Sequence, residues 1–270
     1  MDNALGDFLR ARRERVSPAD VGLPPGHGMR RVPGLRREEV AMLAGISVEY
    51  YLRLEQGRDR NPSAQVIDAL AGVLRLDAEG TAYLTSLAQP RPRRSVGAPD
   101  ERLPRGLEML LGTLNVPALA VNKYSDVLAA NPLARALSPD MAPGLNRLRV
   151  LFTDHAAHGF AEDWDEYTAV AVAHLRAQIG SDSDDERLHA LIGELSLKSE
   201  RFRQLWARHD VRSAQEVTFR IRHPQVGPLE LLVEKFLVVG TVGIEVMLLH
   251  AEPASRTADA LALLASLNAS

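Results

Sequence analysis

The residues of this sequence that could do chemistry are arginines gathered near the N-terminus. Residues 10–60 hold eleven arginines, seven acidic residues and no lysine. A guanidinium carries a fixed charge on a planar fork, which matches phosphate oxygens and the edge of guanine. Residues 1–95 sum to +3 and residues 96–270 to −6, because they hold 15 against 12 and 17 against 23 basic and acidic residues. This asymmetry favours a nucleic-acid-binding N-terminal domain over a merely solvated charged face.

One short stretch is built to present some of these arginines. Residues 36–57, RREEVAMLAGISVEYYLRLEQG, predict two short helices joined by a tight turn. Gly45 stands where a helix needs a left-handed residue to stop, and the Ser47 hydroxyl can cap the second helix. In a helix-turn-helix, the second helix enters the DNA major groove. An ordinary helical hairpin is the alternative. The apolar face of the first helix is expected from Val40, Met42, Leu43 and Ala44.

Three features favour DNA binding over the plain hairpin. They are the alanine and glycine at the turn, the Ser47 cap, and the closing Leu-Glu-x-Gly of residues 54–57. Together they resemble the lambda-repressor-like, or Xre-type, DNA-binding domain. Apolar periodicity before and after this stretch completes an all-α domain of five helices over residues 1–88. Residues 17–35 are an insertion relative to most such domains, and their prolines and glycines exclude regular helix.

The resemblance assigns roles to individual residues of the second, recognition helix and its surroundings. The residues placed to read bases are Val48, Glu49, Tyr50 and Arg53. Arg53 can fork onto guanine O6 and N7, while Glu49 can accept from a cytosine amino group. Those placed against phosphates are Arg36, Arg37, Arg58 and Arg60. Arg13 is expected to pair with Glu55. A homodimer on a two-fold symmetric site is expected, since one recognition helix reads too few bases.

The remainder of the chain changes in character. Residues 89–102, QPRPRRSVGAPDER, lack apolar periodicity and predict a proline-stiffened linker. Residues 103–270 predict a second domain. A helix over 103–114 precedes two short strands around a turn, and three β-branched runs at 216–221, 229–239 and 244–250 precede a last helix at 257–268. Strands at both ends with helices between them predict an α+β domain with a mixed sheet covered by helices.

Several phrases in this second domain resemble the MmyB-like transcription regulators of actinobacteria. They include VPALAVNKYSDVLAANPLARAL, NRLRVLFTD and HPQVGPLELL, and the resemblance runs from about Leu5 to Leu264. It implies a PAS-like C-terminal domain that binds a small apolar or fatty-acyl molecule. His158-Gly159 stands where the family usually carries a basic residue. If that residue contacts the ligand, the ligand class here differs.

An aromatic set marks the expected pocket of this domain. Its members are Trp164, Phe202, Trp206 and Phe219. Aromatic residues at helical spacing more often belong to a core than to the lining of a pocket. Only the family resemblance favours pocket lining here. The pocket is expected between the 216–250 strands and the helix that carries Phe202 and Trp206.

Other function classes find little support in the sequence. It contains no nucleophile elbow, P-loop, dinucleotide fingerprint or zinc-protease motif. His155 and His158 have a spacing that could hold a metal, but a surface pair is favoured. We expect no catalytic residues, metal or cofactor. Cysteine is absent, and no signal core or membrane span is evident, so a cytoplasmic protein is expected.

These observations favour a ligand-responsive, sequence-specific transcriptional regulator. The alternatives are a helical protein-interaction adaptor without DNA binding, and an enzyme whose catalytic residues follow no known motif. The salt dependence of binding distinguishes the regulator from the adaptor. Phosphate contacts release counterions, so the affinity of a regulator for duplex DNA must fall steeply as the salt concentration rises.

Overall fold

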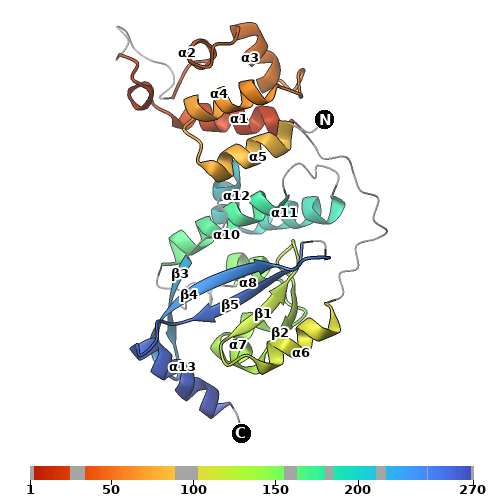
Figure 1. Cartoon of the computed structure of the whole chain (residues 1–270), viewed down its shortest axis with the longest axis vertical. Coiled ribbons are helices and arrows are strands. Elements are labelled where there is room, and N and C mark those ends of the chain that lie inside the picture. Colours follow the sequence, from red (N-terminus) through yellow and green to blue (C-terminus); the bar gives the residue numbers. More distant parts are fainter. Residues whose placement is uncertain are drawn as a thin grey trace. The chain divides into compact units, whose positions relative to one another are not determined.

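The computed structural model of the chain describes residues 3–24, 34–88, 103–154, 163–179, 185–210, 217–241 and 243–268. Two compact units emerge, one containing the N-terminal helices and the other the whole β-sheet (Figure 1). The predicted linker at 89–102 and the residues His155, His158 and Gly159 lie outside the described residues.

The described part of the N-terminal unit is all-α. Its helices are α1 (Ala4–Arg15), α2 (Arg37–Leu43), α3 (Val48–Glu55), α4 (Ala64–Val73) and α5 (Ala78–Ala88). A short 3-10 turn at Pro18–Val21 follows α1. Apolar stripes at helical spacing meet in the centre, where Phe8 meets the Tyr83 ring edge-on at a centroid distance of 5.2 Å. The fully buried side chains there include Leu9, Leu35, Tyr51, Leu54, Ile67, Leu74 and Leu84.

Local chemistry sets the helix-turn-helix as the sequence predicts. Gly45 ends α2 with a φ of +67°, which only glycine adopts without steric cost. Ser47 Oγ accepts a hydrogen bond from the backbone N–H of Tyr50 at 3.1 Å and so caps α3. The predicted apolar face of α2 needs correction, since Met42 is 63% and Leu43 is 37% exposed. Val40 and Ala41 are the buried residues of α2, because each further residue rotates about 100° around the helix.

A buried carboxylate ties three of these helices together. The Glu55 side chain has no exposed surface; its Oε1 lies 2.6 Å from Arg13 Nε and its Oε2 lies 2.7 Å from Arg37 Nε. Arg13 also donates to the Leu35 carbonyl at 3.0 Å. The expected Arg13–Glu55 pair is confirmed, and Arg37 is an additional partner. Burial alone raises the pKa of Glu55, but the hydrogen bonds from Arg13 and Arg37 outweigh it and hold the pKa below its usual value.

The C-terminal unit is built on a five-stranded sheet. Its strands are β1 (Ala118–Val121), β2 (Val127–Ala130), β3 (Val217–His223), β4 (Gly227–Leu237) and β5 (Glu245–His250), in the order β2-β1-β5-β4-β3. Every pairing is antiparallel, so the strand positions are confirmed but the mixed sheet is wrong. The strands β1–β2 and β3–β4–β5 are consecutive hairpins, which can only be antiparallel, and the long-range pairing of β1 with β5 is antiparallel as well.

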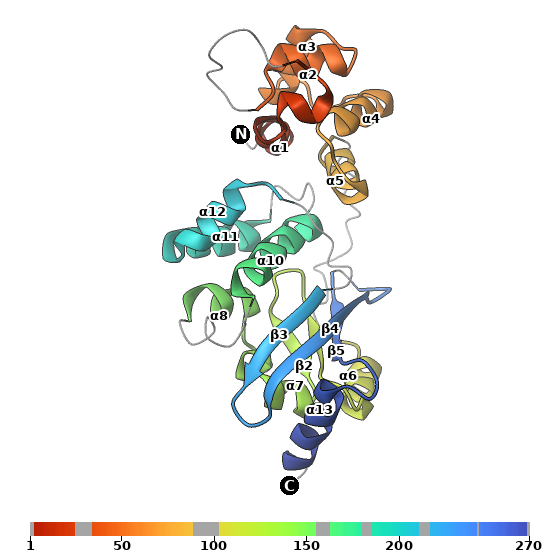
Figure 2. The same ribbon diagram turned by 90° about the vertical axis from the view of Figure 1, so that its left-hand side faces the viewer.

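Helices cover both faces of this sheet. They are α6 (Arg105–Thr113), α7 (Pro132–Leu137), α8 (Arg147–Thr153), α10 (Trp164–Ile179), α11 (Glu186–Lys198), α12 (Glu200–Ala207) and α13 (Arg256–Leu267), with a 3-10 turn at Pro139–Met141. Leu261 and Leu264 of α13 pack with α7 against one face. Leu111 of α6 packs against the other, where Ala118, Ala120 and Val246 point. Figure 2 shows α8 and α6 on opposite sides of the sheet. No helix in the described ranges has the length and apolarity that crossing a bilayer requires.

The buried ion pairs of Glu55 predict a large and local stability effect. Glu55→Gln should cost about 3–5 kcal/mol, because the buried guanidinium of Arg13 loses its counter-charge and Arg37 loses its acceptor. Hydrogen exchange of the α1 and α3 amides in the full chain measures this loss where it occurs. The stabilisation is present above the ordinary carboxylate pKa and disappears as pH falls through the lowered pKa of folded Glu55.

Glu49→Gln is the matched control for this substitution. The Glu49 side chain is 82% exposed on the same helix, so its loss should change stability by less than about 0.5 kcal/mol. Equal amide protection in Glu55→Gln and wild type would remove the ion pairs from the account of stability.

Candidate DNA interface and ligand cavity

The outward face of α3 gathers the predicted base-reading residues. Val48 is 43% exposed. Arg53 lies 3.7 Å from the Glu49 carboxylate, and its guanidinium carbon stands 5.6 Å from the centre of the Tyr50 ring. An exposed ion pair of this kind contributes at most about 1 kcal/mol to stability. Arg53 and Glu49 can therefore exchange this contact for contacts with another molecule at little cost in free energy. The helix can therefore present the carboxylate of Glu49, the guanidinium of Arg53 and the aromatic ring of Tyr50 on one face.

The predicted phosphate contacts divide into two kinds. Arg36, Arg58 and Arg60 are exposed beside the ends of α2 and α3, and Arg60 Nε donates to the Gly57 carbonyl at 3.0 Å. Arg37 differs, because its Nε is held by Glu55 while its side chain stays 43% exposed. Sequence spacing gave no signal for this internal partner, since the approach of α2 to the end of α3 is a tertiary contact.

A cavity of about 70 Å³ lies in the C-terminal unit between the sheet and helices α8 and α10. Its walls are largely apolar, with Leu148 and Leu151 from α8, Val170 from α10, and Phe219, Val233 and Met247 from the sheet. Polar residues also line it, namely Asn122, Ser125, Arg147, Tyr167, His174, Lys235 and Glu245. In the described ranges, no three His, Asp or Glu side chains gather as a metal site.

Strand alternation turns Lys235 toward this cavity. Leu231 and Val233 of β4 point into the core, and Lys235 is the next residue on that face, paired in register with Met247. Its amine has no hydrogen-bond or ion-pair partner in the described part of the chain. Burial lowers the pKa of Lys235 to about 8; Glu245 opposes this shift and Arg147 adds to it.

Arg147 opens α8 and faces the same cavity. One of its Nη atoms donates to the Tyr167 hydroxyl at 2.7 Å and the other lies 3.1 Å from the Met247 sulfur. Its buried Nε has no partner among the described residues. Burial disfavours the charged form, but the interactions with Tyr167 and Asp140 outweigh it and raise the pKa of Arg147. Arg147 therefore stays cationic inside the protein.

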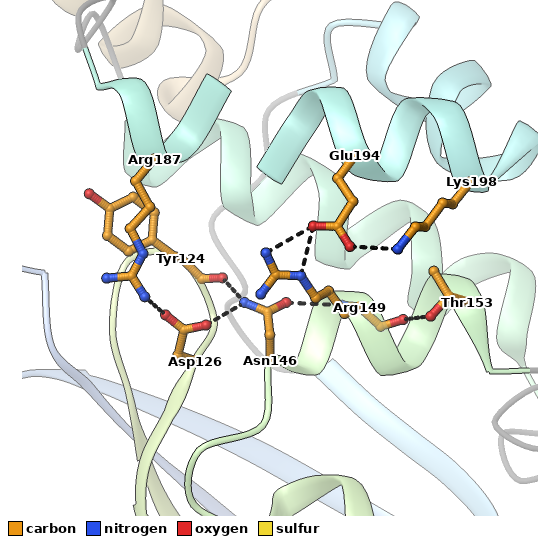
Figure 3. A network of polar contacts seen from close by, with 8 residues as sticks. All are labelled: Tyr124, Asp126, Asn146, Arg149, Thr153, Arg187, Glu194 and Lys198. Carbon is orange, nitrogen blue, oxygen red and sulfur yellow. Dashed lines mark hydrogen bonds and ion pairs between the residues drawn. The ribbon is translucent and has the colours of Figure 1, made fainter. Parts of the chain in front are cut away.

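A polar network fixes the helix that carries Arg147 (Figure 3). Asn146 caps α8 by accepting from Arg149 N at 2.9 Å, and it donates to the Tyr124 carbonyl and to Asp126 at 2.8 and 2.7 Å. The Arg149 side chain binds Glu194 of α11 at 2.9 Å. Arg187 of α11 pairs with Asp126 and lies over the Tyr124 ring. The β1–β2 turn and α11 thus hold α8 from two sides.

The four predicted aromatic residues do not all line this cavity. Phe219 does, and it stacks on Tyr167 at a centroid distance of 4.5 Å. Phe202 is fully buried against Phe152 of α8 at 5.1 Å, so it supports α8 from behind. Trp164 packs against the sheet core, and Trp206 lies half-buried near the end of α12. The described cavity thus lies under α8 and α10, whereas we expected it under α12.

The sequence did not predict the charged groups Lys235 and Arg147 in the lining, for two different reasons. Lys235 carried a usable signal, because Leu229, Leu231 and Val233 set an alternation that places residue 235 on the inner face. Arg147 carried none, since only the packing of α8 on the sheet makes it internal.

Comparison with known protein families decides where the chain belongs. A model described as the MmyB-like transcription regulator ligand binding domain matches residues 103–264. A helix-turn-helix domain model matches residues 4–84. The chain belongs to the MmyB-like transcription regulator family. No curated protein matches it. This MmyB-like chain is accordingly a DNA-binding transcription regulator with a ligand-sensing domain, and the whole cavity falls inside that domain.

The Lys235 amine predicts a stability that depends on pH. The folded-state pKa of about 8 lies below the ordinary 10.5, so the unfolded chain binds more protons between these values and stability rises with pH there. The rise amounts to roughly 3 kcal/mol at most. Lys235→Met should stabilise the protein at pH 7 and abolish the rise, which urea unfolding from pH 7 to 10 measures.

Lys198→Met provides the control for the lysine substitution. Lys198 is 59% exposed beside Glu194, so its removal should leave the pH dependence of wild type intact. Parallel pH curves for Lys235→Met and wild type would show that the Lys235 amine is not desolvated.

Proposed function

We propose that this chain is a sequence-specific transcriptional regulator that binds a two-fold symmetric DNA site as a homodimer and responds to a small molecule. In this proposal residues 1–88 read DNA, residues 89–102 link the domains, and residues 103–270 bind a small apolar or fatty-acyl ligand. It acts in the cytoplasm and catalyses no reaction.

The observation that carries the DNA-reading part is the arrangement of α3. Its outward residues combine a guanidinium fork, a carboxylate and an aromatic ring, while Tyr51 and Leu54 are fully buried on its inner face. Exposed arginines stand before and after the helix-turn-helix, with Arg36 before α2 and Arg58 and Arg60 after α3. A basic rim around an exposed, mixed donor–acceptor face is what a major-groove reader needs.

The ligand part is supported by the cavity beneath α8 and α10. Its volume of about 70 Å³ is smaller than the roughly 150 Å³ of an apolar cavity that admits benzene. A longer acyl tail must therefore displace side chains. Met247 and the leucines of α8 line the wall, and methionine in particular adapts its shape readily.

In vitro site selection with the purified full-length protein tests the regulator proposal. The expected product is an enriched, two-fold symmetric sequence whose affinity falls steeply with salt. An adaptor that docks on protein would enrich no sequence, and any weak duplex binding would not discriminate between sequences.

Arg53→Ala tests base reading. Loss of a bidentate contact to guanine should cost about 1–3 kcal/mol and relax preference at one position of the selected site. Competition binding against every single-base variant of that site measures both effects. Unchanged affinity together with unchanged preference would reject the docking of α3 in the major groove.

Alanine substitutions at Arg36, Arg58 and Arg60 test the phosphate contacts. Each should weaken selected and random duplexes about equally and reduce the slope of log affinity against log salt by about one. Arg75→Ala, which removes an exposed arginine outside the interface, should change neither. If a substitution lowers affinity for the selected site alone, that arginine reads bases instead.

A further inference from the structure

Helix α12 belongs in part to each of the two compact units. Its residues up to Gln204 are part of the C-terminal unit, whereas Leu205 and the residues that follow it, through Asp210, are part of the N-terminal unit. The N-terminal unit therefore includes, besides α1 to α5, a segment that lies far along the sequence. Leu205 is 3% exposed, so this segment is packed into the fold.

The start of α12 is fixed within the C-terminal unit. Phe202 is fully buried, and its ring meets Phe152 of α8 edge-on at a centroid distance of 5.1 Å. Ser199 Oγ accepts a hydrogen bond from the Phe202 backbone N–H at 3.2 Å. Arg201 donates to the Asp165 carbonyl of α10 at 2.7 Å. Because packed interiors transmit displacements, a movement of α8 or α10 acts on α12.

The end of α12 is held on α1 within the N-terminal unit. His209 has a φ of +53°, a left-handed conformation that few non-glycine residues adopt, and Asp210 follows it. The Asp210 carboxylate accepts a hydrogen bond from Arg15 and lies 3.5 Å from an Nη atom of Arg12. Arg15 also donates to the Arg208 carbonyl at 3.3 Å. One carboxylate thus binds two arginines that are neighbours on the surface of α1.

Arg12 depends on this carboxylate more than an ordinary surface arginine would. The side chains of Arg12 and Asp210 are only 23% and 29% exposed. The Nε atom of Arg12 is buried and has no partner among the described residues. Burial lowers the pKa of Arg12, and the neighbouring charge of Arg15 lowers it further, while Asp210 and Asp77 oppose both effects. Loss of Asp210 would leave two adjacent cations without their shared counter-charge.

The same turn of α1 also holds the recognition helix. Arg13 lies between Arg12 and Arg15 in the sequence, and its Nε is 2.6 Å from the Glu55 carboxylate at the end of α3. The last turn of α1 therefore binds the segment after α12 and the end of α3 together. A displacement of Asp210 acts on the turn that positions α3, because Arg12 and Arg13 share one rigid helix.

We infer that Asp210, bound to Arg12 and Arg15, forms a latch between the end of α12 and α1, and that opening this latch changes the affinity of the recognition helix for DNA. The inference rests on the proposed DNA-reading function and adds a regulatory contact to it. The latch is a two-state element in the sense that regulation requires, since its ion pairs are either formed or broken. Whatever moves α12 then alters DNA binding through α1.

Reversible covalent closure of the latch tests the inference on the full-length chain. The protein contains no cysteine, so the double variant Arg15→Cys/Asp210→Cys carries only two thiols. A bis-methanethiosulfonate reagent links them, peptide mapping verifies the intramolecular link, and dithiothreitol removes it. Fluorescence anisotropy on the site-selected duplex measures Kd in both states. Linked and unlinked protein should differ at least about 5-fold in Kd, the lower end of usual allosteric coupling. The linked form should lie nearer to wild type.

Three further variants separate the latch from general effects. Asp210→Asn opens the latch without cysteines, so its Kd should shift from that of wild type in the same direction as the unlinked double variant. Asp68→Asn removes an exposed carboxylate of α4 in the same unit and should leave the Kd close to that of wild type. Asp7→Cys/Asp210→Cys places the first thiol in the opening turn of α1, where no intramolecular link should form.

The outcomes distinguish the latch from the function on which it rests. Failure of Arg15→Cys/Asp210→Cys to link within one chain would show that α12 does not dock on α1. An equal Kd for linked and unlinked protein would overturn the coupling while leaving DNA reading in place, and so would equal shifts for Asp68→Asn and Asp210→Asn. If site selection enriches no sequence, the regulator proposal fails and the role of the latch in DNA binding fails with it.

Discussion

A single carboxylate without access to water, Glu55, is the constraint on which the DNA-binding unit depends. It ends α3, and its two oxygens bind guanidinium groups from α1 and α2. Removing an ion from water costs free energy. Here that cost is offset only while α1, α2 and α3 keep the arrangement that brings Arg13 and Arg37 to Glu55. The orientation of the recognition helix is therefore set from its buried end. The exposed residues Glu49 and Arg53 remain free of that task and can meet DNA.

The C-terminal unit uses buried charge in the opposite way. In the first unit an anion is surrounded by donors that satisfy it, and the result is a closed structural joint. In the second, Arg147 and Lys235 face a cavity that Glu245 also lines, and the Glu245 carboxylate lies 3.0 Å from His174. Buried charges whose hydrogen bonds are satisfied stabilise a fold, whereas titratable groups with shifted pKa values in a cavity are frequent at functional sites. This contrast distinguishes the two sites better than their residue types do.

The sequence predicted those features of the fold that neighbouring residues determine. Gly45 and Ser47 set the turn through their own backbone and hydroxyl. Non-local pairing was out of reach. The antiparallel sheet depends on which strands become neighbours, and the exposure of Met42 depends on which edge of α2 packs inward. Likewise the cavity exists because α8 and α10 pack over the sheet, and the spacing of residues in the sequence does not predict this packing.

A regulator of this kind works only if its ligand binds the DNA-competent and DNA-incompetent states unequally. The central claim is therefore that a ligand bound in the cavity beneath α8 and α10 changes the affinity of the chain for DNA. Fluorescence anisotropy of the selected operator, titrated with full-length protein with and without saturating octanoate, measures this directly. The account predicts a shift in operator Kd of about 5- to 150-fold, the usual range of allosteric coupling. An operator Kd that stays the same at saturating octanoate, with octanoate binding verified in the same buffer, would contradict it.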